Sequence, residues 1–299
     1  MRRAIPFLAA ALVMLAVSAP DTFAQQQIMN GIGLVDYSKK PTFKVGDWAR
    51  YRMTSESQLG MKDDYILTVV IAGEEDFWGD PGFWVETWVE YPGYAPQTRA
   101  ALMSYEIFSD TSATEKLQLY MRKAILQLKE DGTPRIEINK PAASTLRARH
   151  EVKTPVEWSK EHLGQDTVQT PKGTFQARKV LLKQGKGVTQ DVGDSTMYTE
   201  LREDRTSWYA DQVPITHLAR EDIVTISSRK TWLTGRSGDA LALNTRDKGV
   251  GSARLIDFGT GAEPRILPKH LRRSLAEQQA AERAARAKPG TAKAATRRQ

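Results

Sequence analysis

Few residues of this chain are suited to metal or thiol chemistry. It has four histidines, His150, His162, His217 and His270, and no cysteine. No two histidines stand four residues apart, and none lies in an HExxH or HxH pattern, so the spacing of a metal site is absent. Without cysteine there is no disulfide framework, iron–sulfur cluster or thiol nucleophile. We therefore expect no metal site and no cofactor.

Acid–base and nucleophilic patterns are equally scarce. His162 follows Glu161, but neighbours in sequence point to opposite faces of a strand or diverge on a helix, which disfavours an acid–base pair. There is no GxSxG elbow and no glycine-rich phosphate loop. The carboxylate clusters 63–64 and 74–76 lie where a hairpin needs polar ends. We expect no catalytic residues and no enzyme activity.

Aromatic residues give a better lead to a binding site. The chain has seven tryptophans, whose rings offer large apolar surfaces with one polar atom. Trp84 and Trp88 share a strand face with Glu86 and Glu90, a mixture that is not typical of a dry core. Strand aromatics either fill the core or line a concave pocket for an apolar or amphiphilic ligand. The candidate ligand-binding residues are Trp84, Trp88, Trp208 and Tyr209.

Residues 1–24 have the layout of a cleavable signal peptide. Arg2 and Arg3 precede an apolar run over 5–17, and residues 22–24 place small side chains at the −3 and −1 positions of a cleavage site. The run is too short for a stop-transfer helix, and no later segment is apolar for long enough to span a bilayer. No cysteine follows it, which argues against a lipoprotein. We expect a periplasmic or otherwise exported protein that is not integral to the membrane.

The positive charge is concentrated at the C-terminal end. The whole chain carries +7, and residues 252–299 alone, with eleven Lys/Arg and four Asp/Glu, carry +7. A nucleic-acid interface needs its basic patch on the folded body, so no nucleic-acid partner is expected. We predict that 252–299 is a basic tail, helical over 269–288 and disordered beyond. It either contacts an envelope protein or an anionic surface, or stays a solvated appendage.

Between these ends, strand-like runs alternate with turn residues. The run 65–72 is almost wholly apolar, which predicts a strand covered on both faces, and 83–91 alternates in the manner of a half-buried strand. We predict a hairpin around 79–82 and another around 171–173. Further strands are expected at 44–53, 196–201, 206–210 and 223–227.

Helix is expected in one short place within the body. The segment 113–129 shows a helical stripe near its start, while 125–129 and 135–138 flank a good hairpin turn at 130–133. The predicted class is mainly β (α+β), a strongly curved antiparallel sheet or incomplete β-barrel with one or a few helices packed on the open side. Residues 25–251 would form this single domain, between the signal peptide and the tail.

Short motifs resemble a group of bacterial envelope proteins. The segments VGDWARYRM, HLGQDTVQTPKGTFQARKV and WYADQVPITHL carry this resemblance, with a G-x-F-x-A strand at 173–178 and W-x-x-x-x-V-P at 208–214. It extends from Phe43 to about Ser228. The group is similar in fold to the periplasmic lipoprotein carriers of the Lol type, which implies a curved half-barrel and the binding of lipid or another hydrophobe. No catalytic motif is implied.

Two classes of function therefore stay open. The first is a non-enzymatic periplasmic binder or carrier of a lipid-like or hydrophobic ligand, with the half-barrel interior as its site. The second is an envelope structural or assembly factor that acts through protein–protein contacts. A hydrolase with a scattered site is a distant third hypothesis.

Overall fold

The computed structural model describes residues 33–35, 41–58, 60–109, 117–128, 134–138, 156–192, 195–233 and 241–287. The predicted signal peptide, residues 139–155 with His150, and the basic end 288–299 lie outside these residues.

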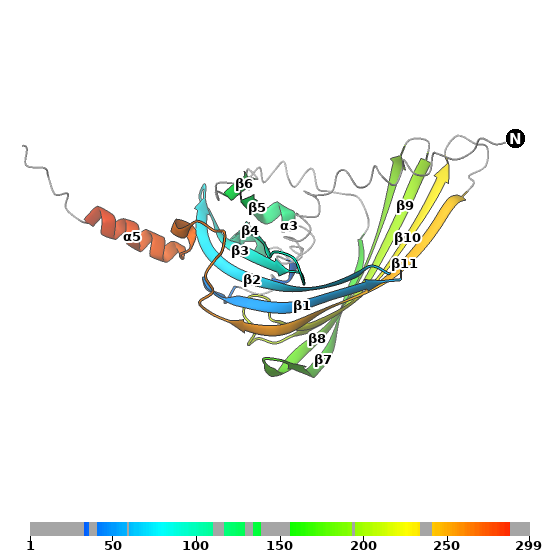
Figure 1. Ribbon diagram of the computed structural model, residues 1–299, viewed down its shortest axis with the longest axis horizontal. Coiled ribbons are helices and arrows are strands. Elements are labelled where there is room, and N and C mark those ends of the chain that lie inside the picture. Colours follow the sequence, from blue (N-terminus) through cyan, green and yellow to red (C-terminus); the bar gives the residue numbers. More distant parts are fainter. Residues whose placement is uncertain are drawn as a thin grey trace, which may run out of the picture.

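Eleven antiparallel strands form one sheet in the order β6-β5-β4-β3-β2-β1-β11-β10-β9-β8-β7 (Figure 1). Two meanders, β1–β6 and β7–β11, are joined where β1 pairs with β11, and β6 and β7 are the two outer strands. The sheet is strongly curved and unclosed, which confirms the predicted fold class. The strands are β1 (Trp48–Ser57), β2 (Lys62–Phe77), β3 (Asp80–Glu90), β4 (Gln97–Ser104), β5 (Met121–Leu128), β6 (Pro134–Ile138), β7 (Val156–Thr170), β8 (Gly173–Val192), β9 (Ser195–Tyr209), β10 (Leu218–Leu233) and β11 (Leu241–Gly259).

The hairpins form where the sequence predicts them. β2 pairs with β3 and β7 with β8 in antiparallel register. The β2–β3 turn lies at Trp78-Gly79, slightly earlier than the predicted 79–82, and both residues have positive φ (57° and 82°). Gly79 suits this left-handed conformation, and its N–H donates to the Asp76 carboxylate at 2.7 Å.

The sheet's inner, concave face is filled over its first half. The 3-10 helix η1 (Tyr105–Ser109) and the short helix α3 (Leu117–Tyr120) lie inside the curve (Figure 1). Together with residues 34–35 and 43–45 they belong to the main hydrophobic cluster. The strands contribute their alternate residues to this cluster, among them Tyr51, Leu67, Val69, Ile71, Phe83, Val85, Met103, Ala253 and Leu255. This packed mass, which we call the plug, closes the interior against β1–β4.

The outer face of β2–β4 is covered as well. A second cluster, formed by Ala72, Phe77, Trp84, Ala100, Leu102 and Ile125, packs against Leu267, which has no exposed surface. Leu267 belongs to a segment, residues 260–274, that leaves β11 and crosses the outer face; we call it the strap. Gly73 makes the crossing possible, because a Cβ there would lie 1.9 Å from the Leu271 carbonyl oxygen. Both faces of β2 and β3 are therefore buried, as the apolar run 65–72 predicts.

The predicted boundary between body and tail at 251/252 is too early. β11 continues to Gly259, its residues 249–259 pair with the whole of β1, and the strap then packs on the sheet. Only a few apolar residues of the strap, separated by charged ones, reach the sheet, and so the composition resembles a tail. The helix expected over 269–288 is present as η3 (Lys269–Leu271) and α5 (Leu275–Ala287).

Two further segments test the strand predictions. The segment 113–129 contains α3 followed by β5, and β5 pairs with β6, so both the helix and the hairpin are confirmed. The runs 196–201 and 206–210 are one strand, β9, and not two. The charged stretch 202–205 resembles a break, yet its side chains pair: Arg205 bonds Glu203, and Gln184 of β8 donates to Glu203 at 2.9 Å.

Candidate functional site

The strap is held by a buried carboxylate. Glu86 has no exposed surface and accepts hydrogen bonds from three successive strap N–H groups, those of Arg265 (2.6 Å), Ile266 (3.3 Å) and Leu267 (3.3 Å). It also accepts the indole N–H of Trp88 at 2.6 Å. These four donors offset the cost of burying the charge. Glu86 is therefore a structural clasp.

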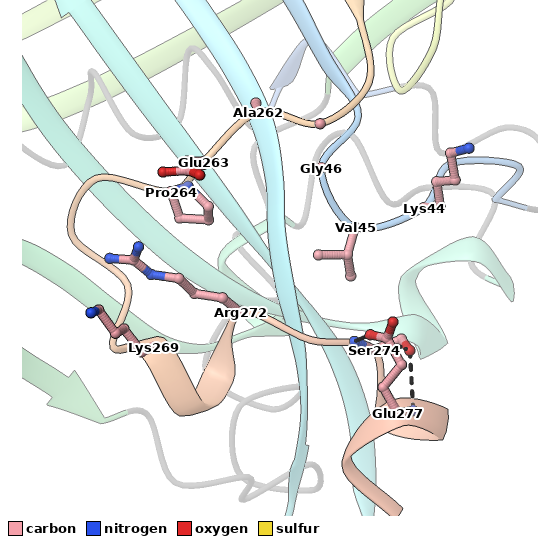
Figure 2. Close-up of a pocket in the computed structure, with 11 residues that line it drawn as sticks. Lys44, Val45, Gly46, Ala262, Glu263, Pro264, Lys269, Arg272, Ser274 and Glu277 are labelled. Carbon is pink, nitrogen blue, oxygen red and sulfur yellow. Dashed lines mark hydrogen bonds between the residues drawn. The ribbon is translucent and has the colours of Figure 1, made fainter. Parts of the chain in front are cut away.

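A polar hollow lies beside the strap. It has a volume of about 700 Å³, and its walls come from residues 44–46, 261–264 and 269–277 (Figure 2). Lys44, Lys269 and Arg272 face Glu263 and Glu277 around it. The N–H groups at the start of α5 are already bonded, because Leu275 donates to Glu74 at 2.8 Å and Glu277 to the Ser274 hydroxyl at 3.2 Å. Charged side chains from three segments line this hollow together with Val45, Ala262 and Pro264.

Trp84 and Trp88 lie on the outer face of β3, under the strap. Trp84 is fully buried and donates its indole N–H to Glu75 at 3.0 Å, and the guanidinium of Arg265 lies 3.9 Å from the centre of the Trp88 ring. The alternation predicted for 83–91 is confirmed, since Phe83 and Val85 face the plug. This Trp–Glu face is buried at Trp84 and Glu86 and half-buried at Trp88 and Glu90, and both glutamates bind the strap.

Trp208 and Tyr209 are neighbours on β9 and so face opposite sides of it. Lys179 and Arg220 lie over the Trp208 ring at 5.0 and 4.5 Å, and its indole N–H donates to Asp166 at 2.9 Å. Arg178 lies 5.8 Å from the Tyr209 ring. The four aromatic candidates therefore do not converge on one place, and their contact with a ligand stays a prediction.

The three described histidines lie in different parts of the fold, and the acidic runs pair with basic side chains. His162 is exposed on the outer strand β7, His270 is exposed in η3, and His217 is buried in the β9–β10 turn. Among the acidic runs, Asp64 pairs with Arg52 at 2.6 Å and Glu75 with Lys123. Within the described ranges, no three His, Asp or Glu side chains are placed to hold a metal ion.

The inner face of the second half differs from the plugged half. Its residues lie in successive rows across β8, β9, β10, β11 and β1, fixed by the strand register. The row Val180–Ser207–Glu221–Ala253–Met53 borders the plug. The next row is Leu182–Arg205–Ile223–Gly251–Ser55, and the one after is Gln184–Glu203–Thr225–Gly249–Ser57.

Beyond the bordering row the inner face is partly exposed. Leu182, Arg205 and Ile223 are half-buried, and Leu201, one row past Glu203, is 42% exposed. In these two rows the β11 positions are Gly251 and Gly249, so no side chain rises from β11 there. We call the rows of Arg205 and Glu203 the open inner face. Its apolar side chains and exposed strand surface could receive a chain-like apolar molecule.

A polar group that the sequence reading missed lies on this face. Glu221 is 3% exposed and accepts the Ser207 hydroxyl at 2.8 Å, while Arg205 donates to Glu203 at 2.9 Å and lies 3.7 Å from Glu221. Burial raises the pKa of Glu221, although Arg205 and Ser207 oppose the rise. Burial lowers the pKa of Arg205, but Glu221 and Glu203 outweigh it and raise that pKa. The only sequence signal was the two-residue spacing of 203, 205 and 207.

Tyr51 ties the two halves together. Its hydroxyl bonds the Thr216 hydroxyl and donates to the Leu218 carbonyl oxygen at 2.9 Å, both in or beside the β9–β10 turn. Burial raises the pKa of Tyr51 well above its usual value, with Glu221 adding to the rise. The turn itself holds Ile215 and His217 at positive φ, 67° and 50°. The VPITH motif is thus a buried corner of the sheet.

Comparison with known proteins gives remote structural likeness alone. No family model and no curated protein matches this chain in sequence. A candidate lipoprotein from Parabacteroides distasonis shares 12% identity (75% of this chain, 99% of that one, TM-score 0.32). A candidate exported protein with a YmcC-like fold from Bacteroides fragilis shares 10% (75% and 100%, TM-score 0.32).

A LolA superfamily protein from Nitrosomonas europaea shares 10% identity, over 77% of this chain and 93% of that one, with a TM-score of 0.23. Its superfamily is the fold group that the sequence motifs resemble. At such scores the three likenesses carry no weight for function. No helix within the described ranges is long and apolar enough to cross a membrane.

Proposed function

We propose that this chain is an exported, non-enzymatic envelope protein that binds a lipid-like or hydrophobic ligand on the open inner face. The observation that carries the proposal is the change from the plug to half-buried Leu182 and Ile223 across one row of the same sheet. Apolar side chains left partly exposed inside a curved sheet favour the binding of an apolar molecule.

The glycines of β11 support the same site. A Cβ at Gly251 would meet the Thr54 carbonyl oxygen at 3.5 Å and the Ile223 Cβ at 3.7 Å, which are ordinary van der Waals distances. The position therefore has room for a side chain but carries none. A ligand lying across β11 would use that space.

The direct test is purification of the mature protein without detergent, followed by native mass spectrometry and titration with N-phenyl-1-naphthylamine, a neutral apolar fluorophore. We expect copurified lipid and saturable binding of the fluorophore in the micromolar range, on the order of −8 kcal/mol. Protein free of lipid that also fails to bind the fluorophore would rule out the proposal.

Gly251→Leu gives the matching variant. A leucine there would cover the open inner face and weaken fluorophore binding by about tenfold or more, equivalent to roughly 1.4 kcal/mol. Val250→Leu is the control, because Val250 lies next to it in β11 on the outer face and is 49% exposed. It should leave binding unchanged.

One observation favours the second candidate, an assembly factor acting through protein contacts. α5 bonds the sheet only at its start, through Glu74 to Leu275 and Gln278, and its residues 279–284 are exposed. Crosslinking in intact cells would test it with a chain truncated after Ser274, which lacks α5. Truncation at 251 is unsuitable, because it would remove half of β11 and the strap. Loss of partner crosslinks in the truncated chain would support this candidate, and unchanged crosslinks would contradict it.

A further inference from the structure

We infer that the ligand of the open inner face is an amphiphile whose head group donates hydrogen bonds and carries no negative charge, such as an amine or a sugar. This inference rests on the proposed function and specifies its ligand class. The head group would lie against Glu203, Arg205 and Glu221, and the chain would lie along Leu182 and Ile223 across β11.

The charges of this face favour a donor. Glu203 and Glu221 carry two carboxyl groups against the single guanidinium of Arg205, which already bonds Glu203. Side-chain exposure is 4% at Glu221 beside the plug, 29% at Arg205 in the next row and 14% at Glu203 in the row after, so the group is more open beyond the bordering row. Lys160 of β7 stands in the same row as Arg205 but two strands away. An anion placed against Glu203 and Glu221 would therefore meet their carboxyl groups first.

Two buried atoms on the same face lack partners. The Ser57 hydroxyl and the Asp247 Oδ1 are buried without a hydrogen bond. Ser57 lies in the row of Glu203, and Asp247 pairs with Ser227 one row further out, so strand alternation places both on the inner face. Leaving a buried acceptor without a donor is unfavourable. An amine or hydroxyl group from a ligand would supply the missing donor to Asp247.

The test compares three ligands with one chain length and different heads. Dodecylamine, dodecyl maltoside and dodecanoate are titrated by calorimetry into the full mature protein, below their micelle concentrations. We expect the amine and the maltoside to bind at least about tenfold more tightly than dodecanoate.

Glu203→Gln sharpens the test. Glutamine keeps the acceptor oxygen for Gln184 and Arg205 but removes one negative charge, so the preference for the amine over dodecanoate should shrink by about tenfold. Glu200→Gln is the matched control, because Glu200 lies on the other face of the same strand and pairs with Arg202 at 2.7 Å. It should leave the preference unchanged, and thermal unfolding checks that both variants fold.

The outcomes separate the two claims. Binding of all three ligands with equal affinity, or tightest binding of dodecanoate, overturns the head-group assignment and leaves the proposed function standing. No binding of any ligand, and none of the apolar fluorophore, overturns both. A preference that Glu203→Gln does not change also overturns the assignment.

Discussion

The two halves of this sheet have the same strand pairing but different surroundings. β2 and β3 are buried on both faces, by the plug inside and the strap outside. In β8, β9 and β10, the inner residues past Ser207 and Glu221 are partly exposed and include charged groups. Curvature alone therefore does not make a binding site. Whether the concave face is available to a ligand depends on whether other segments of the chain already cover it. The first half supplies stability, and the second half has free surface for a ligand.

The largest expected effect comes from Glu86→Ala. It removes the acceptor of three buried strap N–H groups and of the Trp88 indole, so we expect a loss of about 3–5 kcal/mol in the free energy of unfolding. Urea denaturation measures it. Glu90→Ala is the control, because Glu90 pairs with Arg50 on the same strand face but is partly exposed. Equal losses of stability in the two variants would contradict the inference that Glu86 holds the strap on the sheet.

Gly73→Ala should come next. The added Cβ would lie against the Leu271 carbonyl oxygen and force the strap from the sheet, with a loss of about 2–4 kcal/mol. Gly251→Ala, in the open half, adds the same methyl at ordinary contact distances and should change stability by less than about 0.5 kcal/mol. If thermal unfolding shows the same loss of stability for both variants, the inferred difference in packing between the two halves is wrong.

A smaller loss is expected for Tyr51→Phe, which uncouples the halves. It leaves the Thr216 hydroxyl and the Leu218 carbonyl without their shared partner, at a cost of about 1–2 kcal/mol. Thr54→Val is the comparison, since it removes a hydrogen bond to Ser252 from the same strand on the outer face. Hydrogen exchange should show faster opening of the 210–217 turn in Tyr51→Phe alone.

The smallest effect is a pH dependence specific to Glu221. Because burial raises its pKa above 4.5, the folded protein keeps this proton at pH values where the unfolded chain has lost it. The free energy of unfolding should therefore fall as pH rises through that window, and the stability is fully present below the unfolded pKa. Glu221→Gln should lack this fall, and the variant leaves every other ionisable side chain of this face in place. Parallel stability curves for wild type and variant would disprove the assignment.

Local patterns predicted the sheet well. The apolar run 65–72 and the alternation over 83–91 identified β2, β3 and the two faces of β3, because burial on a strand follows a period of two. The helix-to-strand change within 113–129 was also visible. These features depend on neighbours in sequence, which a single sequence contains.

Long-range contacts were not predictable in the same way. The sequence placed 252–259 in a tail because nothing local shows that β11 pairs with β1, about 200 residues away. Glu86 seemed to exclude a dry core for a similar reason: its three donors come from residues 265–267. The group of Arg205, Glu203 and Glu221 joins two strands, so only the register brings it together.

Hydrogen exchange with and without dodecylamine tests the central claim most directly. Without ligand, amides of β2 and β3 should exchange slowly, and those of 181–205 and 222–233 faster. With ligand, protection should increase in β8, β9 and β10 around Leu182, Arg205 and Ile223, and stay constant in β2 and β3. Added protection confined to β2, β3 or η1, or found nowhere, would contradict a ligand site on the open inner face.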